Sequence, residues 1–147
     1  MSKVILVPVD FEQPSTHALD VAKDLARRLD ATITLVHVQT LPVYFYPGVD
    51  PVPLPPTYAE ELSVQAKRSL DALAASAGGL RALLLAGDPA DEILKVVEEL
   101  QPVMVVMGTH GRRGLSRLLL GSVAERVVRN APVPVLTVRP PVEATKA

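Results

Sequence analysis

The sequence predicts an α/β fold, with a parallel, doubly wound β-sheet that carries helices on both of its faces. Five short apolar runs alternate along the chain with four patterns of helical periodicity, which gives the order βαβαβαβαβ. Several of these runs are continuously apolar, as expected of strands that helices cover on both sides. The 147 residues fit one domain, with no internal repeat.

The five expected strands are β-branched or apolar runs bounded by turn residues. They occupy residues 4–9, 31–38, 80–86 and 103–107, and finally the run from Pro134 to Val138. The first two helices are expected over residues 15–29 and 58–75, because apolar residues recur there at intervals of three or four and form one face. The stripe of the second helix consists of Leu62, Ala66, Leu70 and Leu73.

The last two helices have recognisable starts. Asp88 precedes Pro89, and a capping Asp followed by Pro in the first turn is typical of a helix N-terminus. Ser122 stands three residues before Glu125, which is the spacing of a capping box and predicts a helix over residues 122–129.

The composition excludes several classes of function. The formal net charge of −1 gives no global attraction to nucleic acid or to anionic membranes. No apolar run reaches the roughly 20 residues of a membrane span, and the N-terminus does not read as a signal peptide, so a cytoplasmic protein is expected. The absence of cysteine excludes disulfides and Cys-ligated zinc, and the three histidines are too scattered to predict a metal site.

The connection from Thr40 to Thr57 is unusual. It holds six of the fourteen prolines and, together with Tyr58, four of the five aromatic residues. A long connection without structure of its own is often a lid or binding loop. The simpler interpretation, which we favour, is that Tyr44, Phe45 and Tyr46 cover the sheet beside the second strand.

The segment after the fourth strand predicts a phosphate site. Glycines follow the pattern Gly108-x2-Gly111-x9-Gly121-Ser122, and no acid occurs between Glu99 and Glu125. Glycines allow positive φ and remove side chains, so that backbone N–H groups can converge on an anion near the start of a helix. Each feature also has a simpler interpretation, with Ser122 as a helix cap, the glycines as turn residues and the arginines as a solvated patch.

Taken together, these residues resemble the universal stress protein family, and in particular its ATP-binding branch, because the glycine motif is complete. Four further stretches resemble the family: "ILVPVDFEQPSTHAL", "ITLVHV", "AGDPADEI" and "APVPVLTV". The resemblance implies a Rossmann-like, three-layer α/β/α sandwich around a five-stranded sheet of order 3-2-1-4-5. It also implies bound ATP, with Mg²⁺ carried by the phosphates, and a homodimer formed through the last strand.

Carried over by position, the resemblance implies an ATP site. Its residues are Pro8, Val9, Asp10, Val38, Met107, Gly108, His110, Gly111, Arg112, Gly121, Ser122 and Val123. The first four would border the adenine and the ribose, with Asp10 holding the ribose, and the others would border the sugar or the phosphates. Asp10 also has a simpler interpretation as a loop acid before a helix, and His110 as a residue that positions the backbone. Ala124 departs from relatives that carry a second hydroxyl there, which would weaken triphosphate binding by roughly 0.5–1.5 kcal/mol.

Three functions stay open at this point. The chain is an ATP-binding regulator or sensor of stress, a slow ATPase or phosphotransferase, or a nucleotide-free structural dimer. The sequence contains no paired nucleophile and base, so efficient turnover is not expected and no catalytic residue is assigned. The apolar edge strand from Pro134 to Val138 favours a homodimer. An unknown protein partner is compatible with the sequence, whereas nucleic-acid and membrane partners are not expected.

Overall fold

The structure is a computed structural model that describes residues 2–41, 43–109 and 120–139. The predicted site residues His110, Gly111 and Arg112 therefore lie outside the described residues, as do residues 140–147, for which the sequence predicts a flexible tail. In chain order the elements are β1 Lys3–Pro8, α1 Gln13–Leu29, β2 Ala31–Gln39, β3 Val43–Tyr44, β4 Val52–Pro53, α2 Pro56–Ser76, β5 Arg81–Ala86, α3 Pro89–Leu100, β6 Met104–Gly108, α4 Ser122–Asn130 and β7 Val135–Val138.

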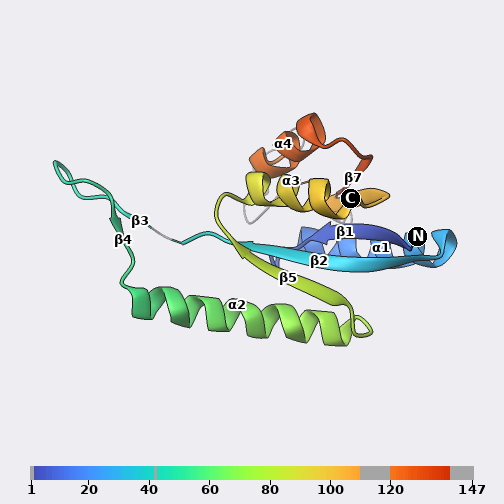
Figure 1. Ribbon diagram of the computed structural model, residues 1–147, viewed down its shortest axis with the longest axis horizontal. Coiled ribbons are helices and arrows are strands. Elements are labelled where there is room, and N and C mark those ends of the chain that lie inside the picture. The colour runs from blue at the N-terminus through green and yellow to red at the C-terminus, as the bar shows by residue number, and fades with distance from the viewer. Residues whose placement is uncertain (1, 42, 110–119, 140–147) are drawn as a thin grey trace, which may run out of the picture.

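The main sheet has five parallel strands in the order β5-β2-β1-β6-β7 (Figure 1). When these five strands are numbered by themselves, the order is 3-2-1-4-5, so the predicted fold class and strand order are confirmed. The chain runs outward from β1 through β2 to β5 and then returns to the other side of β1 with β6. The order therefore reverses between β1 and β6, and open α/β sheets bind ligands at the carboxyl ends of the strands beside such a point.

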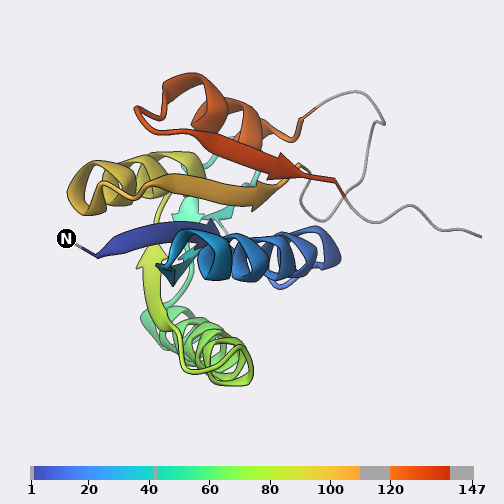
Figure 2. The ribbon, with the colours of Figure 1, turned by 90° about the vertical axis from the view of Figure 1, so that its right-hand side faces the viewer.

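Helices cover both faces of the sheet, and each face has its own apolar core (Figure 2). Ile5 and Val7 of β1 belong to the core under α1 and α2, whereas Leu6 between them belongs to the core under α3 and α4. Successive side chains of a strand point to opposite faces, so a strand that is covered on both sides must be apolar throughout. This explains the continuously apolar run at the start of the sequence.

The structure confirms one of the two predicted helix caps and contradicts the other. Asp88 caps α3 as predicted, because its carboxylate accepts a hydrogen bond from the backbone N–H of Asp91 at 3.0 Å. The predicted capping box at Ser122 is wrong. Gly121 is the N-cap of α4, no side chain caps this helix, and Ser122 is its first helical residue.

The connection after β2 contains a two-stranded antiparallel hairpin, β3 with β4, which the sequence did not predict. Tyr44, Phe45 and Tyr46 are exposed there. The favoured interpretation that they cover the sheet is therefore wrong, and Figure 1 shows the hairpin projecting away from the layered body.

Candidate functional site

A pocket of about 490 Å³ lies at the carboxyl ends of β1, β2 and β6, where the strand order reverses. Nine of the predicted site residues line it: Pro8, Val9, Asp10, Val38, Met107, Gly108, Gly121, Ser122 and Val123. The fold thus brings together residues that are up to 115 positions apart in sequence, from Pro8 to Val123. The three other predicted residues lie outside the described part of the chain. The volume is in the usual range for sites that hold a small molecule.

Asp10 and Ser15 form a hydrogen-bonded turn between β1 and α1. The Oδ1 atom of Asp10 accepts hydrogen bonds from the backbone N–H of Glu12 at 2.9 Å and from the hydroxyl of Ser15 at 2.8 Å. Asp10 therefore does act as a loop acid at a helix start. Its Oδ2 atom receives no hydrogen bond from the residues that the structure describes, and Asp10 is exposed at the pocket wall. The carboxylate is thus held in place while one oxygen is available to a ligand.

His37 holds the ends of β1 and β2 together at the same pocket. Its Nδ1 atom lies 2.7 Å from the backbone carbonyl of Val9, and because a carbonyl only accepts, Nδ1 carries the proton. The ring of Phe11 packs on His37 with a centroid separation of 4.5 Å. Phe11 has a φ of 67°, a left-handed conformation that non-glycine residues adopt at an energetic cost. The backbone carbonyl of Val9, at the end of β1, is therefore fixed by the His37 side chain.

The start of α4 offers free backbone donors to the pocket. The carbonyl of Gly121 accepts the first intrahelical bond, from the N–H of Glu125 at 2.9 Å, and the N–H of Gly121 donates to Thr109 at 2.6 Å. The N–H groups of the residues between them have no acceptor within the helix. Ser122, Val123 and Ala124 all line the pocket. Together with the helix dipole, these groups favour an anion.

Of the two properties for which glycine was expected in this motif, positive φ and a missing side chain, the two described glycines do not use the first. Gly121 has φ −61°, and Gly108 is not among the positive-φ glycines. Gly108 instead permits a close approach. A Cβ atom at this position would lie 3.0 Å from the backbone carbonyl carbon of Pro14 in the first turn of α1. Its missing side chain therefore serves packing between β6 and α1.

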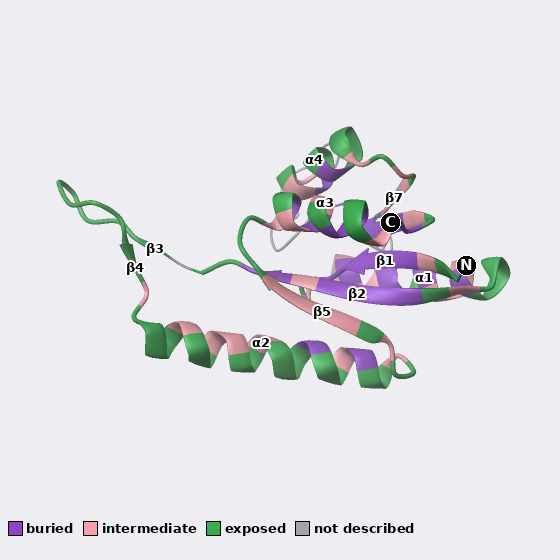
Figure 3. Cartoon of the chain, in the orientation of Figure 1, coloured by how far each residue is buried: buried purple, intermediate pink, exposed green. Residues whose placement is uncertain are grey.

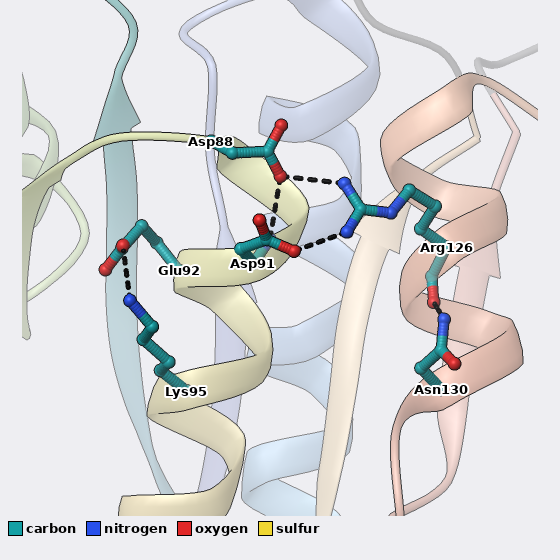
Figure 4. Close-up of polar contacts among 6 residues, drawn as sticks. All are labelled: Asp88, Asp91, Glu92, Lys95, Arg126 and Asn130. Carbon is teal, nitrogen blue, oxygen red and sulfur yellow. Dashed lines mark hydrogen bonds and ion pairs between the residues drawn. The ribbon is translucent and has the colours of Figure 1, made fainter.

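An ion-pair cluster connects α3 with α4 beside the pocket (Figure 4). The guanidinium of Arg126 on α4 pairs with Asp88 at 2.8 Å and also with Asp91 of α3. The backbone N–H of Asp91 and the guanidinium of Arg126 lower the pKa of Asp88, and the bonds to both carboxylates raise the pKa of Arg126. Because Pro89 and the start of α4 both line the pocket, this cluster fixes the separation of two of its walls.

Sequence reasoning missed several residues of this pocket. They are Ser15, Val36, His37, Thr40, Pro89, Ile93 and Thr109 as lining residues, with Arg126 behind them. A polar residue directly after a strand end is a usable signal, and it would have identified Thr40 and Thr109. Ser15, by contrast, lies inside a helical pattern, and no spacing rule connects it with Asp10.

The fold and the pocket define a doubly wound α/β protein with a ligand site at the reversal of its strand order. The chain belongs to the universal stress protein family, whose sequence profile matches residues 1–139. A universal stress protein of Methanocaldococcus jannaschii is 35% identical over 141 residues, which cover 95% of this chain and 83% of the relative.

Solved structures of the family share the fold. The universal stress protein UspA from Lactobacillus plantarum has a TM-score of 0.75 at 27% identity, covering 93% of this chain and 97% of that chain. A universal stress family protein from Arabidopsis thaliana with AMP bound has a TM-score of 0.61 at 22% identity, covering 99% and 97%. In the described part of this chain, no helix is long and apolar enough to cross a membrane. Within the same residues, no group of three or more His, Cys, Asp or Glu side chains is placed to hold a metal ion.

Proposed function

We propose that this chain is an ATP-binding universal stress protein, a small cytoplasmic nucleotide-binding module that forms a homodimer and acts as a regulator or sensor in the stress response. The observation that carries the proposal is the pocket in which Asp10, after β1, faces the same space as the start of α4. The Arabidopsis relative with AMP bound shares only the fold at 22% identity. The proposal therefore rests on the pocket of this chain.

The pocket has an apolar side and a polar side, as an adenine nucleotide requires. Pro8, Val9 and Val38 supply an apolar wall for the adenine. The Oδ2 atom of Asp10 accepts hydrogen bonds from the ribose hydroxyls. Met107 and Gly108 border the sugar and the first phosphate.

The phosphates bind at the start of α4. The N–H groups of Ser122, Val123 and Ala124 are directed along the helix axis, and the positive end of the helix dipole favours their anionic charge. A helix terminus contributes about 0.3–1 kcal/mol, whereas micromolar affinity requires about 8 kcal/mol. The adenine wall and the ribose contact must therefore supply a large share, with Gly111, Arg112 and His110 as further predicted phosphate ligands. Mg²⁺ would be carried by the phosphates.

The polar side chains Ser15 and His37 favour binding over catalysis, because both already form hydrogen bonds that hold the fold. The hydroxyl of Ser15 lies 2.8 Å from Asp10 and 3.0 Å from the carbonyl of Glu12, so it holds the turn together. His37 is engaged with Val9 through Nδ1. We therefore assign no catalytic residue and expect at most slow ATP hydrolysis, which an assay for ADP would detect.

The homodimer is proposed to form through the last strand, from Pro134 to Val138. β7 is an edge strand that pairs only with β6 among the described strands, and Leu136 is 37% exposed on it. An unpaired apolar edge favours pairing with its own copy. Light scattering that returns the monomer mass at working concentrations would contradict this part of the proposal.

Thermal unfolding with and without Mg·ATP tests nucleotide binding. A ligand present at 100 times its dissociation constant, and bound only by the folded state, stabilises by about 2.7 kcal/mol. We expect ATP to raise the unfolding midpoint by roughly 5–10 °C in a domain of this size. AMP and GTP serve as controls for the phosphates and the base. If ATP does not shift the midpoint of protein first shown to be nucleotide-free, the proposal is wrong.

Replacement of Arg126 by Gln should weaken ATP binding without unfolding the protein. The variant releases the start of α4 from α3, so that the N–H groups proposed to bind the phosphates are less well positioned, and the affinity should fall roughly 3–10-fold. The ion pair between Asp88 and Arg126 should also be lost in acid. Because the pKa of Asp88 is lowered in the folded state, its contribution is present above about pH 4 and disappears as the pH falls through the folded value.

Arg129→Gln is the matched control. Arg129 pairs with Glu125 within α4, so its loss removes a surface ion pair without separating the two helices. Isothermal titration calorimetry measures the ATP affinity of both variants. Equal affinities of the two variants would show that the α3–α4 connection does not position the site.

A further inference from the structure

Residues 43–58, called the arm below, leave the body of the protein between β2 and α2. The arm contains β3 and β4, a turn in which the N–H of Val49 donates to Tyr46 at 3.1 Å, and the start of α2. Figure 1 shows the arm beyond the carboxyl edge of the sheet, and Figure 3 shows it exposed along nearly its whole length. Among the strands that the structure describes, those of the arm pair with each other and not with the main sheet.

The arm carries a large exposed aromatic surface. Tyr44, Phe45, Tyr46 and Tyr58 are 50%, 78%, 60% and 59% exposed. At about 200 Å² for a complete aromatic side chain, these four expose on the order of 500 Å². That is about the size of the largest apolar patch on a typical monomer, and such patches mark interaction sites. The neighbouring Val43, Val49 and Val52 are also exposed and enlarge it.

The first half of α2 continues this surface with residues that are only partly covered. The fully buried residues of α2 are Leu70 and Ala74, both in its second half. Leu62 and Ala66 belong to the same predicted stripe but are only half-buried, and Val64 is exposed. The stripe of α2 is therefore buried only in its second half, whereas the first half, which Ser63 connects to Gln39 of β2 by a hydrogen bond, is partly covered and lies next to the arm in the chain (Figure 3).

Charge and proline restrict the kind of partner. No Lys or Arg occurs between Arg28 and Lys67, whereas Asp50, Glu60 and Glu61 are acidic. The arm and the first half of α2 therefore offer no basic residues that would attract nucleic acid or anionic membranes. Pro51 and Pro53 remove N–H donors from the hairpin, so another strand cannot readily extend it, and contact must come from side chains.

We propose that the arm packs against the arm and the first half of α2 of a second copy of this chain, around a twofold axis. An arm and a partly covered helix stripe that are adjacent in each chain form a self-complementary surface, because the twofold axis places each arm on the other helix. Each arm and the surface that receives it bury apolar area on both chains, which brings the total into the range of about 1,200–2,000 Å² found in stable complexes. The prolines stiffen the arm, which reduces the entropy lost on docking.

This contact is distinct from the β7 edge and does not depend on ATP. If both contacts form, the assembly is a tetramer built from two kinds of dimer. Tyr44, Tyr46 and Tyr58 are the three tyrosines of the chain, and no Trp is present, so intrinsic fluorescence reports on the arm alone. Acrylamide quenching of the unmodified protein over a dilution series, with mass from light scattering, therefore follows arm burial directly. We expect quenching to increase at least about twofold as the assembly dissociates. An assembly with the same quenching as the dilute monomer would overturn the proposal.

Two sets of variants complete the test. Because Tyr44 and Phe45 are exposed in the monomer, the Tyr44→Ser/Phe45→Ser double variant should keep its unfolding midpoint. Compared in a Leu136→Asp background, which removes the β7 contact, the double variant should weaken self-association at least about 100-fold. Leu136→Asp on β7 is the control and should retain the arm contact. The chain has no cysteine, so Phe45→Cys mixed with Leu62→Cys should yield a mixed dimer with a short bifunctional maleimide. No mixed dimer, an unchanged association constant, or arm-dependent binding to phosphatidylcholine vesicles by a chain that stays monomeric would each overturn the proposal.

Discussion

Replacement of Gly121 by Val should reduce ATP affinity at least about 100-fold while the protein remains folded. Gly121 lines the pocket at the N-cap of α4, immediately before the free N–H groups proposed to bind the phosphates. A branched side chain there occupies the space through which a phosphate approaches them. The loss corresponds to about 2.7 kcal/mol, and the thermal shift produced by ATP should disappear.

The backbone at this position tolerates the substitution. Gly121 has φ −61° and ψ 160°, an extended conformation that β-branched residues favour. The cost in stability is therefore limited to the difference between Gly and Val as N-cap residues, about 1 kcal/mol. Thermal unfolding of the ligand-free variant measures this cost separately from the binding defect.

Ala131→Val is the matched control for Gly121→Val. Ala131 stands at the opposite end of α4 and also has an extended backbone, with φ −71° and ψ 132°. The same side chain is thus introduced at the other terminus of the same helix, away from the pocket. Calorimetric titration should show wild-type ATP affinity for this control. If Gly121→Val binds ATP as tightly as Ala131→Val, the nucleotide does not lie at the start of α4.

The order of the main elements could be predicted because each depends on local sequence. The continuously apolar run at Ile5–Val7 indicated a strand covered on both faces, and its side chains do divide between two cores. Asp88 before Pro89 identified the start of α3 for a similar reason, since capping involves residues three positions apart. Patterns that involve residues close together in the sequence can be recognised without knowledge of the fold.

Features that depend on neighbours distant in the chain could not be predicted. Arg126 pairs with Asp88 and Asp91, 38 and 35 residues away, and nothing in its local sequence distinguishes it from Arg129. The hairpin of β3 and β4 was missed because two-residue strands between prolines have no periodicity. The predicted capping box at Ser122 was wrong because Gly121, which has no side chain, is the N-cap of α4. The spacing of Ser122 and Glu125 alone does not show which residue is the N-cap.

Gly108→Ala should destabilise the protein by about 1–3 kcal/mol, which lowers the unfolding midpoint by roughly 3–10 °C. The added Cβ would lie 3.0 Å from both the backbone carbonyl carbon and the Cβ of Pro14, and 3.1 Å from its carbonyl oxygen. These atoms belong to the rigid first turn of α1 and cannot rotate away, so α1 must shift relative to β6.

The shift should also weaken ATP binding, because Ser15 follows Pro14 and holds Asp10 in the pocket through a bond of 2.8 Å. Gly121→Ala is the control, since it adds the same methyl group to the other pocket glycine, where the backbone is extended and α1 is not involved; its midpoint should fall less. Thermal unfolding followed by far-ultraviolet circular dichroism measures both variants. An unchanged midpoint for Gly108→Ala would mean that α1 and β6 are not in close contact, and Gly108 would then have to be explained by the ligand, as the glycine pattern first suggested.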